Sequence, residues 1–600
     1  MTPLRTYRPP RYEEIARIED GDIRISTGTS RIFGFGMSTA GALTISEEDR
    51  VEEVYLHPEK SSQERGIVLL LFLGSCLYLK FFYNYTTLHS DEGIVLEGAQ
   101  RILQGQVPYR DFFSFYTPGS YYWTALLFKI FGSSILAPRT ALVVYGGVFS
   151  ALTYLLARRV CSRGSSLLAT GLALVVCLPY SFYVQHSWDS SLLAFLTIYS
   201  AIRLLETPGP TAAFVTGSLA ALTVLFEHSK GAGLLFGLAL GFALWALSTR
   251  RESAVKKQSL TMAAGFLWPF VVTFAYFGSQ HAIGPMLAGW LWPLHHYSEV
   301  NRVNYGFLHL SSVQWNALHS GSWTWRLFAF FVLSPAVLIC VLPLLTFGIL
   351  MAQILMLLRK RTDDMRTAYY VVVGAALIGL WLPAVAIRPD VAHILYLTPL
   401  FAVSGAWILD GRDIPLKLLH TGKPILAWYL VGSFTAFGLA LLLNSVAAQH
   451  RLETRRGSLR SSEADDVIPY IDEHISPGGK IFVYPYQPLY YYLTATSNPT
   501  SYEYLQPGMH TVEQSTQVVR QLEQDGTAIV LFTPSFRDFI AVSWPNTALG
   551  VIASRDPVAD YIVAHYRLCK ILNSGSSIYW FMLRKDLSCS EVPRLAEPIR

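Results

Sequence analysis

Charge is scarce in this chain of 600 residues. Asp, Glu, Lys and Arg make up 15% of the sequence and hydrophobic residues 52%, whereas a soluble domain usually carries about 25% charged residues. This balance excludes an ordinary soluble protein and indicates a membrane protein. The formal net charge is only +5. Because no run of Lys and Arg resembles a nucleic-acid contact surface, nucleic acid is excluded as a partner.

Several motifs that carry known chemistry are also missing. The sequence has no glycine-rich nucleotide-binding motif, no Gly-x-Ser-x-Gly element, no internal repeat and no apolar signal-peptide core after Met1. The six cysteines stand singly, at Cys76, Cys161, Cys177, Cys340, Cys569 and Cys589. Their spacing excludes a disulfide framework and a C-x-x-C metal site.

The sequence does contain a series of apolar runs, each near the roughly 20 residues that a helix needs to cross a bilayer. They lie near residues 66–83, 136–157, 164–184, 187–205, 211–227, 231–248, 260–280, 326–357, 367–387, 391–409 and 424–446. The expected fold class is therefore a polytopic α-helical membrane protein with about eleven transmembrane helices. The long run 326–357 contains Pro335 and Pro343, where a tilt or a break is expected.

Lys and Arg gather in three of the loops between these runs, and such basic loops stay on the cytoplasmic side of a membrane. The clusters are Arg158, Arg159 and Arg163; Arg250, Arg251, Lys256 and Lys257; and Arg359, Lys360, Arg361 and Arg366. With these clusters inside, the loop 84–135 and residues 450–600 fall outside, provided that 118–132 is a surface or re-entrant helix. We therefore expect a multi-pass protein of the cytoplasmic (inner) membrane, with a cytoplasmic N-terminus and a periplasmic or extracellular C-terminal domain.

Two polar regions flank the predicted transmembrane domain of residues 66–449. Residues 1–65 are polar and mixed in charge, which indicates a disordered cytoplasmic tail, with a small folded domain as the alternative. From residue 450 onwards, short apolar strands alternate with helical patterns. This alternation predicts a small soluble α/β domain over 450–600 with a mainly parallel sheet. A hairpin is expected at residues 573–576.

Cys569 and Cys589 belong to this C-terminal domain, where a location outside the cytoplasm permits a disulfide. A hairpin turn at residues 574–575 places Cys569 opposite Trp580, well short of Cys589. A bridge requires the chain after Leu583 to fold back. Two free thiols are therefore the favoured expectation, and the disulfide is the alternative.

The loop 84–135 contains an adjacent acid pair, Asp91 and Glu92, followed by a short helical pattern and an aromatic stretch. A loop this rich in Tyr and Trp is typical of the membrane surface. A carboxylate held there is a candidate general base that activates an acceptor hydroxyl. The alternative is that the acids cap a helix, since Ser90 and Asp91 precede the helical pattern. We favour the base for Asp91 and leave both interpretations open for Glu92.

Other ionisable residues fall on the same predicted side. Lys230 and His228 stand beside a glycine between two apolar runs, which suits a phosphate head group, and a short solvated turn is the alternative. Arg388 is a second phosphate candidate in the loop before His393. The alternative for Arg388 is a pair with Asp390 that closes the loop.

Two further places carry candidate contacts. His186 and Asp189 lie at the start of an apolar run, where an ionisable group is usually functional, although a buried structural hydrogen bond is the alternative. The loop 281–325 is rich in Trp, Tyr and His, including the adjacent His295 and His296, and suits a sugar or an isoprenoid chain. Adjacent histidines without a third spaced ligand are insufficient to define a metal site.

Several short motifs follow one another between about residues 66 and 410. They are Ser90-Asp91-Glu92-Gly93, Tyr116-Thr117-Pro118-Gly119, Tyr121-Tyr122-Trp123 leading to Phe131-Gly132, Arg139, and His228-Ser229-Lys230-Gly231. Their order and the topology resemble the GT-C membrane glycosyltransferases, near the protein O-mannosyltransferases and the lipid A aminoarabinose transferases. O-mannosyltransferases often have Pro-Pro where this chain has Thr117-Pro118, and a domain like that after residue 450 is not general in the family.

The resemblance implies a membrane glycosyltransferase that takes a sugar from a polyprenyl-phosphate donor and passes it, with inversion, to a lipid, glycan or protein of the cell envelope on the outer face. It implies that Asp91 is the catalytic acidic residue and that Lys230 binds the donor phosphate. From the residues themselves we further expect a catalytic role for Glu92, donor-phosphate contacts from His228, Arg139 and Arg388, and acceptor or sugar contacts from Tyr116, Asp189, His186, His295 and His393. Metal dependence varies in the superfamily, so a divalent metal is left open and no other cofactor is expected. The alternatives are a transporter or flippase of lipid-linked sugars, and a non-catalytic scaffold that displays the C-terminal domain.

Overall fold

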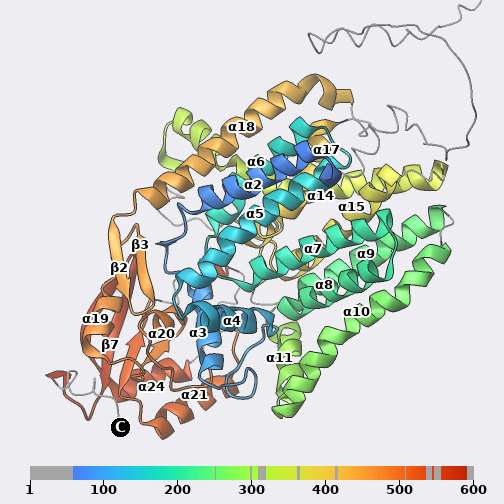
Figure 1. Cartoon of the computed structure of the whole chain (residues 1–600). Helices are drawn as coiled ribbons and strands as arrows, with labels where there is room; N and C mark the ends of the chain where they lie inside the picture. Colours follow the sequence, from blue (N-terminus) through green and yellow to red (C-terminus); the bar gives the residue numbers. More distant parts are fainter. Residues whose placement is uncertain are drawn as a thin grey trace, which may run out of the picture. The chain divides into compact units, whose positions relative to one another are not determined.

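The computed structural model describes residues 58–249, 252–297, 301–308, 319–360, 365–411, 417–506, 509–535, 543–545 and 556–590 (Figure 1). All of these belong to one compact unit, Val51–Arg600. Residues 1–57 of the predicted tail lie outside the described residues. The described chain begins with the 3-10 helix η2 (Pro58–Lys60) and with α2 (Ser62–Leu79), which starts before the predicted run at residue 66.

Long apolar helices follow the predicted runs. Within the described ranges, eight helices are long and apolar enough to cross a membrane. They are α2, α5 (Leu136–Arg158), α6 (Arg163–Tyr180), α9 (His228–Thr249), α10 (Glu252–Ser279), α14 (Trp323–Lys360), α15 (Met365–Ile387) and α18 (Lys417–Val446). Although α14 contains Pro335 and Pro343, it stays one continuous helix. The chain is therefore a multi-pass membrane protein.

The other three predicted runs are helical but are not among these eight. They form α7 (His186–Glu206), the shorter α8 (Pro210–Phe226), and a helix pair, α16 (Val391–Leu395) and α17 (Thr398–Asp410). The pair is separated because the second residue of α17 is a proline, which lacks an N–H and suits the first turn of a new helix. The count of about eleven spans stays a prediction.

The loop after α2 folds into two short helices, α3 (Ser90–Leu103) and α4 (Gly119–Phe131). With 13 residues, α4 is shorter than a bilayer span, in keeping with a surface or re-entrant helix. Helix α20 (Leu489–Leu493) packs on α3 (Figure 1). A Cβ atom on Gly93 would lie 2.1 Å from the backbone nitrogen of Leu489, so this close approach requires glycine.

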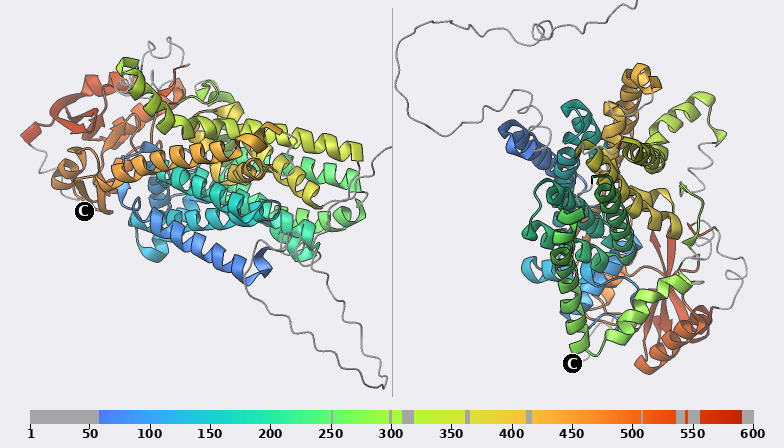
Figure 2. Two further views of the ribbon diagram at one scale, coloured as in Figure 1. Left: turned by 90° about the horizontal axis from the view of Figure 1, so that it is seen from above. Right: turned by 90° about the vertical axis from the view of Figure 1, so that its right-hand side faces the viewer.

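A three-stranded sheet joins the first loop to the chain after residue 450. Its order is β1 (Tyr85–Thr86), β3 (Gly457–Ser461) and β2 (His450–Thr454). Strand β1 pairs parallel with β3, and β2 pairs antiparallel with β3. The C-terminal region is thus hydrogen-bonded to the segment that leads into α3, and both views of Figure 2 place it at one end of the long helices.

The second sheet has four strands in the order β4 (Phe482–Tyr484), β5 (Ile529–Phe532), β7 (Ser577–Arg584) and β6 (Tyr566–Ser574). Only β4 and β5 pair in parallel, so the expected mainly parallel sheet is wrong. The reason is the predicted hairpin, whose Gly575 adopts a φ of 54° and which adds two antiparallel strands to the sheet.

The remaining described helices surround this sheet or border the first loop. They are α11 (Ile283–His296), α19 (Val467–His474), α21 (Val512–Asp525) and α24 (Pro557–His565). Side chains of α21 and α24 pack with β4 and β5 in one hydrophobic cluster. The fold class predicted from the sequence, a helical membrane protein with a small C-terminal α/β region, is confirmed.

Cys569 and Cys589 form a disulfide, with 5.5 Å between their Cα atoms, so the favoured expectation of free thiols is wrong. Two local features explain the difference. A β-bulge leaves Cys569 without a partner residue in the ladder, and Trp580 pairs with Ile571 instead. After β7 ends at Arg584, the chain turns back and brings Cys589 to the bulge.

Candidate active site

A cavity of about 950 Å³ lies between the helix ends and the C-terminal region. Its walls come from the start of α3, the end of α6, the segments 227–230 and 383–393, and C-terminal segments that include residues 486–487 and 504–506. Segments far apart in the sequence therefore meet around one space. Several helices and loops separate these segments along the chain, but the fold brings the segments together around the cavity.

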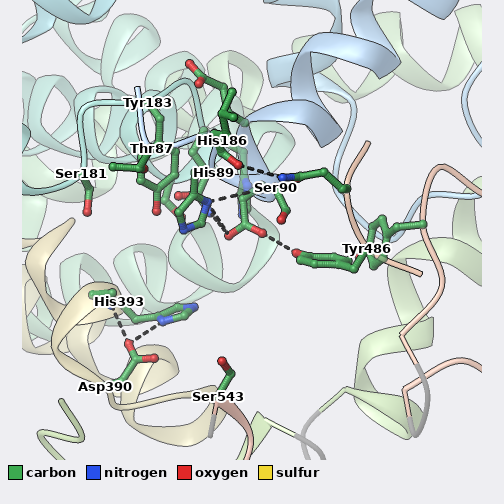
Figure 3. Close-up of a pocket in the computed structure, with 18 of the residues that line it drawn as sticks. Thr87, His89, Ser90, Ser181, Tyr183, His186, Asp390, His393, Tyr486 and Ser543 are labelled. Atoms are coloured by element: carbon green, nitrogen blue, oxygen red, sulfur yellow. Dashed lines mark hydrogen bonds and ion pairs between the residues drawn. The ribbon is translucent and has the colours of Figure 1, made fainter. Parts of the chain in front are cut away.

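Asp91 lies at this cavity in the first turn of α3, with 26% of its side chain exposed. The Tyr486 hydroxyl donates a hydrogen bond to one carboxylate oxygen, and the Gln185 amide nitrogen lies 3.4 Å from the other. His89 caps α3 by accepting a hydrogen bond from the Asp91 backbone N–H, and its ring stacks on Tyr183 (Figure 3). The carboxylate is thus held by neutral donors yet remains open to the cavity.

Glu92, the neighbouring acid, is fully buried and paired with Arg139. Two guanidinium nitrogens lie 2.9 and 2.6 Å from its two oxygens, and the Arg139 side chain is 1% exposed. Arg139 also donates to the Tyr85 carbonyl, and the Val184 N–H donates to Glu92. Because both charged groups are occupied with each other, their contacts favour a role in holding α3 against α5 over the predicted catalytic and phosphate-binding roles.

Lys230 lies in the cavity wall with its Nζ atom 3.0 Å from a carboxylate oxygen of Glu227. It also donates to the Ser187 carbonyl and to the Ser190 hydroxyl, at 2.9 and 3.1 Å. Burial raises the pKa of Glu227, but Lys230 and His186 lower it more strongly, to about 2. The lysine charge therefore faces the cavity already compensated by an ionised carboxylate. His228 lines the same wall.

Arg388, Asp390 and His393 form a third charged group on the cavity. The Arg388 Nε atom lies 2.5 Å from one Asp390 oxygen, and the His393 Nδ1 atom lies 2.6 Å from the other. Arg388 further donates to the Ser543 carbonyl at 2.7 Å. The predicted pair between Arg388 and Asp390 is present, and it lies in the cavity wall.

The five predicted acceptor or sugar contacts divide into two sets. Tyr116 and His186 line the cavity with their rings 4.0 Å apart, as does His393. Burial lowers the pKa of His186 to about 4, so its imidazole is neutral at physiological pH. Asp189 and His295 are not among the residues that line the cavity.

Asp189 is buried beside the cavity and serves a structural contact. It accepts a hydrogen bond of 2.9 Å from the Tyr145 hydroxyl, which accepts one of 2.7 Å from the Trp123 indole. This chain connects α4, α5 and α7, in agreement with the alternative of a buried structural hydrogen bond. His295 is exposed on α11.

The sequence reasoning missed most of the tyrosines and glutamines of the cavity. They include Tyr183, Gln185, Tyr396, Tyr486, Gln487, Tyr504 and Gln506. A signal was present after residue 484, where tyrosines and glutamines are dense between two strands. Polar aromatic side chains of this kind suit a buried site that must also donate hydrogen bonds. Within the described ranges, no group of three His, Cys, Asp or Glu side chains is placed to hold a metal ion.

Comparison with solved structures identifies the class of fold. The chain is similar to ArnT from Cupriavidus metallidurans in the apo state, with a TM-score of 0.53, 13% identity, and coverage of 90% of this chain and 100% of that one. The same protein bound to undecaprenyl phosphate has a TM-score of 0.51 and 12% identity, with coverage of 88% of this chain and 99% of that one. The chain therefore shares the fold of this protein, and the GT-C resemblance drawn from the sequence is confirmed at the level of the fold.

Within that class, residues 116–276 match the model of the family described as dolichyl-phosphate-mannose-protein mannosyltransferase. A more distant structural match is the Archaeoglobus fulgidus oligosaccharyltransferase tethered with an acceptor peptide, with a TM-score of 0.45, 11% identity, and coverage of 85% of this chain and 74% of that one. No curated protein sequence matches the chain.

Proposed function

We propose that the chain is a glycosyltransferase that moves a sugar from a polyprenyl-phosphate donor to an acceptor hydroxyl on the outer face of the membrane. The observation that carries the proposal is the Asp91 carboxylate, which is held by Tyr486 and Gln185 at the wall of a cavity that also contains Lys230 and Arg388. A base beside cations suits a reaction in which one oxygen loses a proton while another gains negative charge.

The proposed reaction is a single displacement with inversion. Asp91 accepts the proton of the acceptor hydroxyl, and that oxygen attacks the anomeric carbon of the sugar. The bond from this carbon to the phosphate oxygen breaks, and its electron pair stays on the departing phosphate. Positive charge is needed most at that oxygen, because negative charge increases there in the transition state. The acceptor is a lipid, a glycan or a protein of the cell envelope.

A lipid phosphate is the proposed donor because the cavity joins charged side chains to the ends of apolar helices. Lys230 lies in the first turn of such a helix, α9, and Arg388 directly follows another, α15. The similar protein from Cupriavidus metallidurans has been crystallised with undecaprenyl phosphate. A carrier of this kind has an isoprenoid chain for the membrane and an anionic group for the cavity.

Binding of undecaprenyl phosphate tests this proposal. Lys230→Ala is expected to weaken binding roughly tenfold or more, because a charge-assisted hydrogen bond is lost and Glu227 remains as an uncompensated anion. Lys230→Arg is expected to keep part of the affinity, since the charge remains but the geometry changes. The measurement is the lipid-induced rise in melting temperature of the purified protein in detergent.

Lys129→Ala is the matched control, because Lys129 is exposed on α4 and does not line the cavity. It should bind the lipid as the unchanged protein does. The converse variant, Glu227→Gln, removes the anion beside Lys230 and should tighten binding. Equal affinity in Lys230→Ala and the unchanged protein would exclude this lysine from donor binding.

The same proposal places the C-terminal region outside the cytoplasm. The disulfide between Cys569 and Cys589 supports this location, because such bonds persist in oxidising compartments. The described arginines of two basic clusters do not line the cavity, in keeping with the positive-inside rule; they are Arg158, Arg159 and Arg163 around the α5–α6 junction, and Arg359 and Arg366 near the end of α14 and the start of α15.

Reporter fusions test this sidedness directly. A phosphatase reporter fused after residue 455 is expected to be active outside the cytoplasm, and one fused near residue 253 is expected to be inactive because it stays inside. A green fluorescent protein at the same two positions should give the opposite pattern. An inside signal at residue 455 would contradict the proposed location of the cavity.

A further inference from the structure

Among the residues that the structure describes, each lysine and arginine that lines the cavity pairs with a carboxylate. Arg139 pairs with Glu92, Lys230 with Glu227, and Arg388 with Asp390. Each pair carries no net charge, so these pairs alone provide little attraction for an anionic phosphodiester. A further positive charge has to come from a group outside these pairs.

His393 is placed to provide that charge. Asp390 accepts hydrogen bonds from both the backbone N–H and the Nδ1 atom of His393, at 2.8 and 2.6 Å, which fixes the ring on α16. The side chain is 37% exposed and lines the cavity. Figure 3 shows His393 and Asp390 on one side, with the open centre of the view between them and Ser90. The Nε2 atom is therefore available to a ligand.

Asp390 and Arg388 set the charge around this ring. Burial raises the pKa of Asp390, but His393 and Arg388 lower it more strongly, to well below its usual range. The carboxylate thus stays ionised beside the His393 ring. With His393 protonated, the group of Arg388, Asp390 and His393 has one net positive charge, and with His393 neutral it has none.

We propose that His393, held by Asp390, is the titratable cation that binds the phosphate of the lipid-linked donor, so that donor affinity rises when His393 is protonated. This inference rests on the proposed function and adds to it a specific phosphate contact and a pH dependence. The role differs from the acceptor or sugar contact expected from the sequence. Asp390 acts as the positioning residue, because it touches His393 and not the donor.

Other ionisable groups around His393 act on the same equilibrium. They are Asp390 and Arg388 before α16, Tyr396 after it, Tyr180 at the end of α6, Tyr183, His186, Glu227, His228 and Lys230 in the adjoining walls, Tyr297 after α11, and His89 and Asp91 at the start of α3. The tyrosines are neutral in the histidine range, and burial keeps His186 neutral there as well. His89 and His228 are the other histidines that line the described cavity, so the experiment must separate both from His393.

The test uses undecaprenyl methyl phosphate, a diester whose single negative charge is constant between about pH 5.5 and pH 8.5, so that any change with pH comes from the protein. Affinity of the unchanged protein is expected to rise roughly tenfold as the pH falls through this range. His393→Gln should bind weakly at every pH. His393→Lys should bind tightly at every pH, because its charge is permanent there.

His565→Gln is the control, since this histidine lies on α24 and does not line the cavity. It should keep the pH dependence of the unchanged protein. Thermal melts show which of the two His393 variants is folded. If a folded variant, His393→Gln or His393→Lys, keeps the pH dependence of binding, the inference is overturned. The pH dependence would then belong to another group such as His89. Absence of diester binding at every pH in the unchanged protein would instead contradict the proposed function itself.

Discussion

Asp91→Asn is expected to lower the rate of sugar transfer by about two or more powers of ten, the usual scale for the loss of a general base. The amide has nearly the shape of the carboxylate and still accepts a hydrogen bond from Tyr486, so the variant should remain folded. It cannot take a proton from the acceptor hydroxyl. The measurement compares turnover of the lipid-linked sugar by purified proteins, with folding checked by thermal melt in detergent.

Asp111→Asn is the matched control for this change. Asp111 belongs to the same loop and is partly exposed, but it pairs with Arg110 and does not line the cavity. Its replacement should leave the rate within a small factor of the unchanged protein. A folded Asp91→Asn protein with full activity would remove the base from the mechanism and would favour a transporter or a scaffold.

Breaking the pair of Glu92 and Arg139 is expected to have the largest effect on stability. Both side chains are almost completely buried, and removal of one partner from a buried ion pair costs roughly 3–5 kcal/mol, because the other charge is left without compensation. Glu92→Gln and Arg139→Met should therefore each lower the free energy of unfolding. The double variant should lose less than the sum of the two, because no unpaired charge remains.

The exposed pair of Arg451 and Glu453 provides the comparison. Glu453→Gln should leave the melting temperature unchanged, since exposed pairs contribute little to stability. When transfer rates are divided by the folded fraction of each protein, Glu92→Gln should keep more activity than Asp91→Asn. Single variants at Glu92 and Arg139 that melt like the unchanged protein would show that the pair does not hold α3 against α5.

Much of the helical part of the fold could be predicted from the sequence, because a membrane helix is encoded locally by a long apolar run. Every predicted run is helical in the structure. The sheets were harder to predict, because a strand pairs with segments that are distant in the sequence. Nothing near Tyr85 in the sequence indicates that it pairs with Arg460, and nothing near Cys569 reveals the bulge that frees it from the ladder.

In the candidate site, too, local features could be predicted from the sequence, and contacts between distant segments could not. Asp91 could be found because a carboxylate directly after a membrane helix is unusual, and the pair of Arg388 and Asp390 is close in the sequence. The partner of Glu92 is 47 residues away, and Tyr486 is 395 residues from Asp91. Such contacts depend on how the C-terminal region folds over α3. Sequence patterns alone therefore could not separate Asp91, which is partly exposed to the cavity, from Glu92, which is buried in an ion pair with Arg139.

The proposed donor is tested most directly by the lipids of cells that lack this chain. If it uses a polyprenyl-phosphate sugar, mass spectrometry of lipid extracts should reveal one such lipid accumulating in the deletion strain. The lipid should return to its normal level when the unchanged chain is restored, and it should stay high when a folded Asp91→Asn chain is restored to the same amount. A lipid-linked sugar pool that is the same in all of these strains would contradict a transferase that consumes this donor.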